Sequence, residues 1–362
     1  KWTIVTERTQ GVTPYDEVQP AHAGIAGFVG SLAKEYPHWK LRAVDIESLE
    51  ASPARECLAS AFDPRGDALA HRRGEWFRQT LARMTSPPAA EPAYRQGGVY
   101  VVIGGAGGLG EAWTRHVIER YRANVVWIGR RDYDARIDAK ITRLSELGPA
   151  PLYVTADAAD RSSLERARET IRNLYPAIHG VVHSAVVLRD QSLARMDEAA
   201  FRESLAAKTD ATVNMDGTFG EDALDFVLFF SSIVSFLKTP GQANYAAGCS
   251  FADAFAHWLR KRRRCRVKIM NWGYWGSVGV VSDEAHNRIM RSAGFGSIEP
   301  GEGMKALQEL IGSDLHQLAF LKTYGDRATA ALDLKEAVAY HARAARRGSP
   351  RPPAVLAGEA SA

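Results

Sequence analysis

A glycine-rich segment between a short apolar run and a helical pattern restricts the fold of this chain more than any other feature. Residues 98–103 are mostly apolar and β-branched, and residues 111–121 have one apolar helical face. The loop between them contains Gly104, Gly105, Ala106, Gly107, Gly108, Leu109 and Gly110. Such glycines permit a tight turn, close approach of a pyrophosphate and close helix–strand packing, and the helix N-terminus offers N–H groups to phosphate. The sequence therefore predicts a dinucleotide-binding loop.

Apolar runs and helical patterns alternate along the rest of this region. Strands are expected at residues 124–129, 152–154, 180–182, 226–230 and 267–270, and helices at residues 161–175, 197–215 and 243–261. Alternating strands and helices indicate an α/β fold with a Rossmann-like, doubly wound parallel sheet. The nearly continuous apolar strands fit a sheet that is covered on both faces.

The two ends of the chain have different patterns. A strand, a helix and a strand are expected at residues 2–5, 20–36 and 41–46, without a glycine fingerprint, and residues 86–92 are rich in Pro and Ala. We predict that residues 1–95 form a smaller, truncated Rossmann-like structural subdomain with its linker, and that residues 96–341 form the catalytic subdomain. Residues 342–362, rich in Ala, Arg and Pro, are expected to be a disordered linker.

Composition excludes several classes of protein. The 46 Lys and Arg residues against 42 Asp and Glu residues give a net charge of +4 on 362 residues, which implies no broad basic field for nucleic acid. Three scattered cysteines predict neither a disulfide framework nor a zinc site. No signal peptide and no long apolar run are present, so we expect a cytoplasmic location without a membrane partner.

The second strand of the predicted sheet ends in Arg130 and Arg131, and no acid precedes Asp132. An acidic residue in this region would bind the ribose 2′-hydroxyl of NAD, whereas Arg accommodates the 2′-phosphate of NADP. The pattern therefore favours NADPH, with a solvated basic strand end as the alternative. Asp157, after the third strand, is a candidate partner for the adenine amine or an ordinary exposed loop carboxylate.

Two hydroxyl-bearing residues form a candidate catalytic pair. Ser232 ends a buried strand, and Tyr245 follows thirteen residues later at the start of a helix. A Tyr that donates a proton to a carbonyl needs its pKa of about 10 lowered, which a nearby Lys cation achieves. The position four residues after the Tyr is Cys249, so we expect the cation to come from Lys208, on the helix before the serine strand.

In order and spacing, these motifs resemble the ketoreductase domain of modular polyketide synthases, a branch of the short-chain dehydrogenase/reductase superfamily. The similarity is greatest to domains of synthases that are served by separate acyltransferases. Besides the glycine loop, the matching segments are Trp127 to Arg131, His183-Ser184-Ala185, Ala206-Ala207-Lys208, Ser231-Ser232, Gly241 to Ala247 and Asn271-Trp272-Gly273. They cover about residues 97–325, and residues 27–37 resemble the family's noncatalytic structural subdomain.

The resemblance implies NADPH-dependent reduction of a β-ketoacyl thioester. The substrate would be carried on the phosphopantetheine arm of an acyl carrier protein, and other domains of the same synthase would be partners. The implied catalytic set is Tyr245, Ser232 and Lys208. The implied cofactor contacts are the glycine loop, Arg130, Arg131, Asp157, Ala158, Ser184, Ala185, Lys208 and Tyr245.

Cys249 is the main departure from the family, which usually has Asn at this position to organise the Lys and a relay water. We therefore expect a carbonyl or an ordered water within hydrogen-bond reach of Lys208. A catalytically silent scaffold domain remains an alternative because of this substitution. A free-standing reductase of a small ketone is a second alternative.

Stereochemical markers favour type B, which gives a (3R)-hydroxyl. Leu188 and Asp190 match two of the three residues of the type-B loop, and Pro240 and Asn244 match its other markers. The Trp of the opposite type would stand at Leu237 and is absent. Residues 282–298 are expected to form a lid that contacts substrate through Met290. Trp272 is expected to line the crevice, or else to pack in the core.

Overall fold

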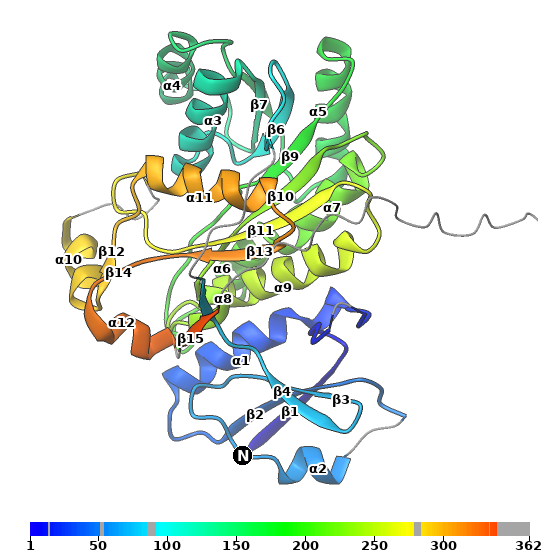
Figure 1. Ribbon diagram of the computed structural model, residues 1–362, viewed down its shortest axis with the longest axis vertical. Coiled ribbons are helices and arrows are strands. Elements are labelled where there is room, and N and C mark those ends of the chain that lie inside the picture. The colour runs from blue at the N-terminus through cyan, green and yellow to red at the C-terminus, as the bar shows by residue number, and fades with distance from the viewer. Residues whose placement is uncertain (14, 51–53, 85–91, 279–283, 333, 339–362) are drawn as a thin grey trace, which may run out of the picture.

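The computed structural model describes residues 1–13, 15–50, 54–84, 92–278, 284–332 and 334–338. Figure 1 shows a small N-terminal unit around one sheet and a larger unit around a second sheet. The predicted linker at residues 342–362 lies outside the described residues, as does most of the Pro- and Ala-rich segment at residues 86–92.

The larger unit has a parallel sheet, as predicted, and its seven strands include β13 (Gln317–Phe320), which we did not predict. The order of the sheet is β13, β11 (Arg266–Trp272), β10 (Phe226–Ser232), β9 (Gly180–His183), β6 (Val99–Ile103), β7 (Asn124–Gly129) and β8 (Leu152–Thr155). The chain runs from β6 outward to β8 and then crosses back to β9. The strand order therefore reverses between β6 and β9, and ligands in open α/β sheets bind at the carboxyl edge of such a point.

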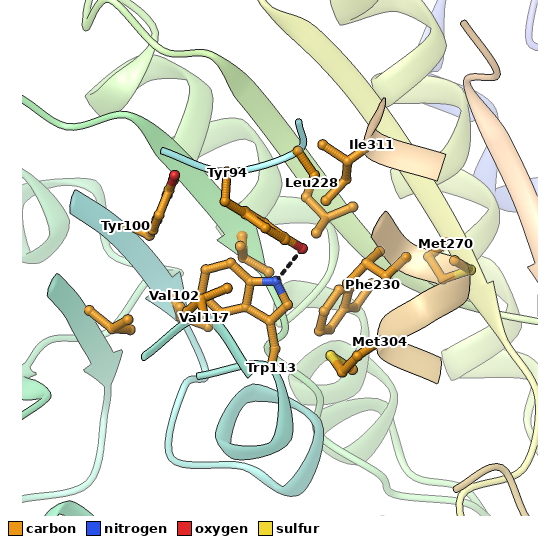
Figure 2. Packing of buried hydrophobic residues seen from close by; sticks show 14 of the residues in the cluster. Tyr94, Tyr100, Val102, Trp113, Val117, Leu228, Phe230, Met270, Met304 and Ile311 are labelled. Carbon is orange, nitrogen blue, oxygen red and sulfur yellow. Dashed lines mark hydrogen bonds between the residues drawn. The ribbon is translucent and has the colours of Figure 1, made fainter. Parts of the chain in front are cut away.

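Helices cover both faces of this sheet (Figure 1). One face packs against α3 (Gly108–Tyr121), α4 (Ala135–Ser145) and α11 (Pro300–Gly312), and the other packs against α5 (Arg161–Leu174), α7 (Thr209–Phe219) and α9 (Ala243–Arg260). Successive side chains of a strand point to opposite faces of the sheet, so alternate strand residues pack into two hydrophobic clusters, one on each face. Figure 2 shows the first cluster, in which Trp113 Nε1 donates to the Tyr94 hydroxyl at 3.0 Å.

The helix expected at residues 197–215 is two helices, α6 (Glu198–Ala206) and α7. The break falls at Lys208, which is the N-cap residue of α7 and is only 3 % exposed. Its side chain runs to β10, where Nζ donates to the carbonyl oxygen of Phe230 at 2.9 Å. The prediction of one continuous helix was therefore wrong, and the helix is interrupted at Lys208, the residue expected to supply the cation.

The N-terminal unit contains a four-stranded sheet of order β1 (Trp2–Glu7), β2 (Leu41–Ile46), β3 (Leu69–Arg72) and β4 (Glu75–Arg78). The unit also contains a short 3-10 helix η1 (Pro20–His22), α1 (Gly24–Glu35) and α2 (Ala54–Ala59). The strand–helix–strand prediction is confirmed at β1, α1 and β2, which are followed by a β3–β4 hairpin that we did not predict. The domain boundary at residue 95 stays a prediction.

Helix α1 lies against α9 (Figure 1). The approach is so close that a Cβ atom on Gly27 would lie 2.2 Å from the carbonyl oxygen of Ala246. The N-terminal unit therefore contacts the backbone next to Tyr245, because Ala246 is the following residue in α9.

Shorter elements complete the larger unit: α8 (Val234–Leu237), α10 (Glu284–Ser292), β12 (Phe295–Gly296), β14 (Lys322–Thr323) and α12 (Gly325–Leu332). Strand β5 (Ala82–Met84) pairs with β15 (Lys335–Val338). Within the described residues, every helix is too short or too polar to cross a membrane.

Candidate active site

The glycine loop lies at the carboxyl end of β6, beside the point where the strand order reverses. Gly104 has a φ of +82°, and a Cβ atom there would lie 2.8 Å from the backbone of Ala185. Ser184 N donates to the Ile103 carbonyl at 2.8 Å, which holds the segment after β9 against the loop. These contacts require a residue without a side chain at Gly104.

The start of α3 fits a phosphate group. Its N-cap residue Gly107 makes no side-chain capping hydrogen bond, so no side chain satisfies the first N–H groups of the helix. Gly110 lies where a Cβ atom would be 2.6 Å from the Gly105 carbonyl oxygen, and the helix therefore packs closely on the loop. The loop and helix have the geometry that the dinucleotide prediction requires.

The predicted 2′-phosphate residues lie at the end of β7. Arg130 forms an ion pair with Glu203 of α6 at 2.7 Å, and Arg131 lies 3.6 Å from Asp134. Glu203 also accepts from Arg189 at 2.7 Å, and the two guanidinium groups lower its pKa. Nothing in the sequence distinguished Glu203 from any other acid on an amphipathic helix, so sequence reasoning missed this bridge.

The adenine-side candidates lie in the turn after β8. The exposed Asp157 accepts from the Ala159 N–H at 2.9 Å, and its neighbour Ala158 is buried. The Asp157 carboxylate therefore stabilises its own turn. It is the exposed loop carboxylate that the alternative interpretation expected, and its contact with the cofactor stays a prediction.

The predicted catalytic residues meet at the carboxyl edge of β10. Ser232 is the last residue of that strand, and Tyr245 lies in the first turn of α9. The Ser232 hydroxyl is hydrogen-bonded to the Tyr245 side chain, and the Cys249 thiol faces both Tyr245 and Lys208. The structure therefore places Ser232 beside Tyr245, and places Tyr245 and Lys208 beside one buried thiol.

The expected lowering of the Tyr245 pKa is not present in this arrangement. Burial, followed by the neighbouring Cys249, raises the pKa of Tyr245 well above its ordinary value, and the hydrogen bond from Ser232 offsets only part of that rise. Burial also lowers the pKa of Lys208, which weakens it as a cation, and its Nζ is directed to the Phe230 carbonyl. The lowered pKa of Tyr245 that we expected is therefore absent from this structure, and the effect of Lys208 on Tyr245 stays a prediction.

The carbonyl expected near Lys208 is that of Phe230, at 2.9 Å. Cys249 is fully buried, and burial raises the pKa of its thiol to about 11 despite the nearby Lys208. His183 is also buried, stacks on Phe229, and has its pKa lowered to about 3 by burial and then by Lys208. Both side chains are therefore neutral packing groups near pH 7.

The stereochemical markers lie next to Tyr245. Asn244 is fully buried, and its Nδ2 donates to the Arg189 carbonyl at 3.1 Å. Gln242 Nε2 donates to the Asp190 carboxylate at 2.6 Å, a contact that the sequence analysis did not anticipate. These two hydrogen bonds hold the loop that contains Leu188 and Asp190 against the start of α9. Pro240 is exposed one turn before that helix.

Two predicted substrate contacts have a different environment. Trp272 is buried in edge-to-face contact with Phe230 and Trp275, which is the core interpretation rather than the crevice-lining one. Met290 is half-buried on α10 and packs with a cluster that includes Phe295. The first two residues of the expected lid, 282 and 283, lie outside the described residues, and the role of the lid stays a prediction.

We searched the part of the chain that the structure describes for a metal site. That part holds no group of three or more His, Cys, Asp or Glu side chains arranged to bind a metal ion.

Comparisons with known proteins agree with this architecture. A family model described as "KR domain" matches residues 98–277. Polyketide synthase PksM of Bacillus subtilis is 49% identical over 323 residues, which are 89% of this chain and 8% of PksM. Polyketide synthase ThaG of Burkholderia thailandensis is 46% identical over 339 residues, or 94% of this chain and 6% of ThaG. The chain thus spans less than a tenth of these relatives.

Solved structures show the same fold. A ketoreductase domain from the bacillaene assembly line has a TM-score of 0.77 at 23% identity and covers 91% of this chain and 79% of its own. A ketoreductase from the first module of phoslactomycin biosynthesis in Streptomyces sp. HK803 has a TM-score of 0.79 at 25% identity, covering 91% and 77%. The chain therefore belongs to the ketoreductase domain family of polyketide synthases, oxidoreductases of the short-chain dehydrogenase/reductase type that use a nicotinamide cofactor.

Proposed function

We propose that this domain reduces a β-ketoacyl thioester to the (3R)-β-hydroxyacyl thioester with NADPH. The single observation that carries the proposal is the meeting of Ser232, Tyr245 and Lys208 at the sheet edge next to the glycine loop. A hydroxyl pair and a cation beside a dinucleotide loop suit proton donation to a ketone oxygen.

The cofactor role rests on the loop after β6 and on the end of β7. The uncapped start of α3 would hold the pyrophosphate, and Arg130 and Arg131 would bind the 2′-phosphate. A nicotinamide cofactor bound there would supply the hydride for the β-carbonyl carbon. Glu203 would then share Arg130 with the phosphate, since the two anions compete for one guanidinium group.

The side chains of Ser232, Tyr245 and Lys208 would carry out the proton transfer and the positioning that the reduction needs. The Ser232 hydroxyl donates to the ketone oxygen, and the Tyr245 hydroxyl transfers its proton to that oxygen as the alkoxide forms. Because burial keeps the pKa of Tyr245 high, the phenol carries its proton throughout the neutral range. Lys208 would hold the cofactor ribose and would stabilise the charge that develops on Tyr245.

The relatives PksM and ThaG support the choice of substrate. We infer that the ketone reaches the site on the phosphopantetheine arm of an acyl carrier protein, in a cytoplasmic synthase served by separate acyltransferases. The attachment of Asn244 and Gln242 to the 188–190 loop supports a fixed entry side for the substrate, which a type-B product requires.

A silent scaffold domain is the second candidate, and Cys249 is the observation that favours it. The experiment that separates the two mixes the protein with NADPH and a β-ketoacyl N-acetylcysteamine thioester, and follows NADPH absorbance and the chirality of the product. We expect NADPH consumption and the (3R) alcohol. NADPH binding without consumption would identify the scaffold, and faster turnover of an α-keto thioester would reassign the substrate.

A further inference from the structure

One carboxylate of the N-terminal unit joins two segments that border the candidate active site. Glu35 is the last residue of α1, and its Oε2 accepts from the Leu193 N–H at 2.9 Å and from the Ser192 hydroxyl at 3.1 Å. Its Oε1 accepts from the Gly241 N–H at 2.9 Å. Both oxygens are therefore used, and each one binds a different segment of the larger unit.

The first segment is the loop that follows β9 and contains the residues expected to select the product stereochemistry. Residues 184–192 have neither helix nor strand geometry, so side chains of other elements determine the path of this loop. The Ser204 hydroxyl and the Asn244 amide donate to backbone carbonyls of the loop at 2.8 and 3.1 Å. Glu35 adds an attachment at the far end of the loop.

The second segment is the turn that leads into α9. The Gln242 N–H donates to the Thr239 carbonyl at 3.2 Å, and Gly241 between them has a φ of +79°. With Pro240 in front of Gly241, this geometry fits a type II turn. The Gly241 N–H takes no part in the turn hydrogen bond and donates to Glu35 instead. Glu35 therefore holds the turn from which the helix of the proposed acid begins.

The loop and the turn lie side by side where Glu35 joins them. A Cβ atom on Gly241 would lie 4.0 Å from the carbonyl carbon of Gln191, which is an ordinary van der Waals contact. The Gln242 side chain donates to Asp190 across the same boundary. A shift of either segment would therefore change the gap between them, and Glu35 binds both.

The position of Glu35 in α1 is unfavourable for the helix itself. A negative charge at a helix C-terminus is opposed by the helix dipole. The three donors to Glu35 all lie on the larger unit. The neighbouring Lys34 also reaches that unit, where its Nζ donates to the Leu237 carbonyl. The carboxylate therefore serves the contact between the units and not the stability of α1.

We propose that Glu35 is a positioning residue that determines stereochemical specificity. It holds the 188–193 loop and the 239–242 turn in the one relative position that presents a single face of the ketone to the hydride. The inference rests on the proposed reduction of a ketone beside Tyr245. It gives the N-terminal unit a part in the choice of product through a residue that does not touch the substrate.

The first test measures the ratio of (3R) to (3S) alcohol by chiral chromatography in Glu35→Gln and Glu35→Ala. Gln keeps the size of the side chain but turns an N–H group toward one of the donors, and Ala removes both acceptors. We expect the ratio to fall about 10-fold in Glu35→Gln and further in Glu35→Ala, because a hydrogen bond to a charged group is worth about that factor or more. A parent-like ratio in both variants would overturn the proposal.

The product ratio separates positioning from stability. Both alcohols come from the same folded molecules, so a loss of folded protein lowers the rate and leaves the ratio unchanged. If the parent gives the (3S) alcohol and the variants erode that preference, the type-B product falls and the role of Glu35 stands.

Glu17→Gln is the matched control. Glu17 is also an acid of the N-terminal unit that contacts α9, but it lies 3.6 Å from Lys261 and 3.7 Å from Arg262, at the other end of that helix. We expect this variant to keep the parent ratio. Equal erosion in Glu17→Gln and Glu35→Gln would mean that any lost charge between the units has this effect, which would overturn the proposal.

A second measurement is independent of turnover. In Glu35→Ala, the amide hydrogens of Leu193 and Gly241 should exchange with deuterium about 10-fold faster, while those of β9 and β10 keep the parent rate. Unchanged exchange at the two amides, or faster exchange throughout the domain, would refute the attachment. If exchange rises at the two amides while the parent reduces no ketoacyl thioester, the attachment stands and the proposed function falls.

Discussion

Replacing Gly27 by Ala tests whether the N-terminal unit sets the position of the catalytic helix. The new Cβ atom would lie 2.2 Å from the Ala246 carbonyl oxygen, 2.5 Å from its carbonyl carbon and 2.6 Å from Ser250 Oγ. Two of these atoms are backbone, so neither can rotate away. Helix α1 or the first turn of α9 has to move by about 1 Å to restore ordinary contact, and such overpacking costs about 1–3 kcal/mol.

Two effects of opposite sign determine the result for Gly27→Ala. Alanine gains about 1 kcal/mol from helix propensity, so the net loss of stability is about 0–2 kcal/mol, or a few degrees in melting temperature. Activity is the more sensitive readout. Tyr245 precedes Ala246, and a displacement of about 1 Å at a reacting group costs on the order of 100-fold in rate.

The assay compares melting temperature and kcat in Gly27→Ala and Gly301→Ala. Gly301 is a helical glycine at which an added Cβ atom meets nothing within 4 Å, so this control should be neutral or slightly stabilising and fully active. If Gly27→Ala retains parent kcat, the contact between α1 and α9 does not position Tyr245, and the reasoning is refuted.

Three further substitutions test the site. Tyr245→Phe should keep NADPH affinity, measured by fluorescence titration, and lower kcat about 100- to 10,000-fold; parent-like turnover would exclude Tyr245 as the acid. Replacing Arg130 and Arg131 by Ala should remove most of the preference for NADPH in kcat/KM, because a charge-assisted contact contributes about 1.5–3 kcal/mol; equal parent efficiency with NADH would contradict this. Cys249→Asn should change kcat only a few-fold, because the Phe230 carbonyl already accepts from Lys208; a large gain would favour the scaffold alternative.

The fold was predictable because its signals are local. The β6–loop–α3 segment carries its own periodicity and glycines, and each apolar run of the large sheet predicts a strand wherever it pairs. The β3–β4 hairpin was missed because Arg72, Arg73 and Glu75 interrupt its apolar pattern. Arg72 is buried in the structure with Asp45 as its partner, and that partner lies 27 residues away in the sequence.

The site was predictable as a set of residues and not as an electrostatic environment. Spacing related Ser232 to Tyr245, the place of Lys208 before the serine strand made it the expected cation, and the resemblance then implied the same three residues. The ionisation of Tyr245 and Lys208 depends on burial and on neighbours such as Cys249, which the motif does not specify. The expected lowering of the Tyr245 pKa failed for this reason, because burial outweighs the influence of a cation that is itself desolvated.

Helix α9 explains why the N-terminal unit and the catalytic residues belong to one structure. One side of the helix carries Tyr245 and Cys249, and the small residues Ala246 and Ser250 face α1. A movement of α1 is therefore transmitted to the turn that carries Tyr245. The same movement would change a cavity of about 390 Å³ between the two units, in whose wall Asp253 lies. The N-terminal unit thus contacts α9 beside Tyr245 and lines the cavity that Asp253 also borders.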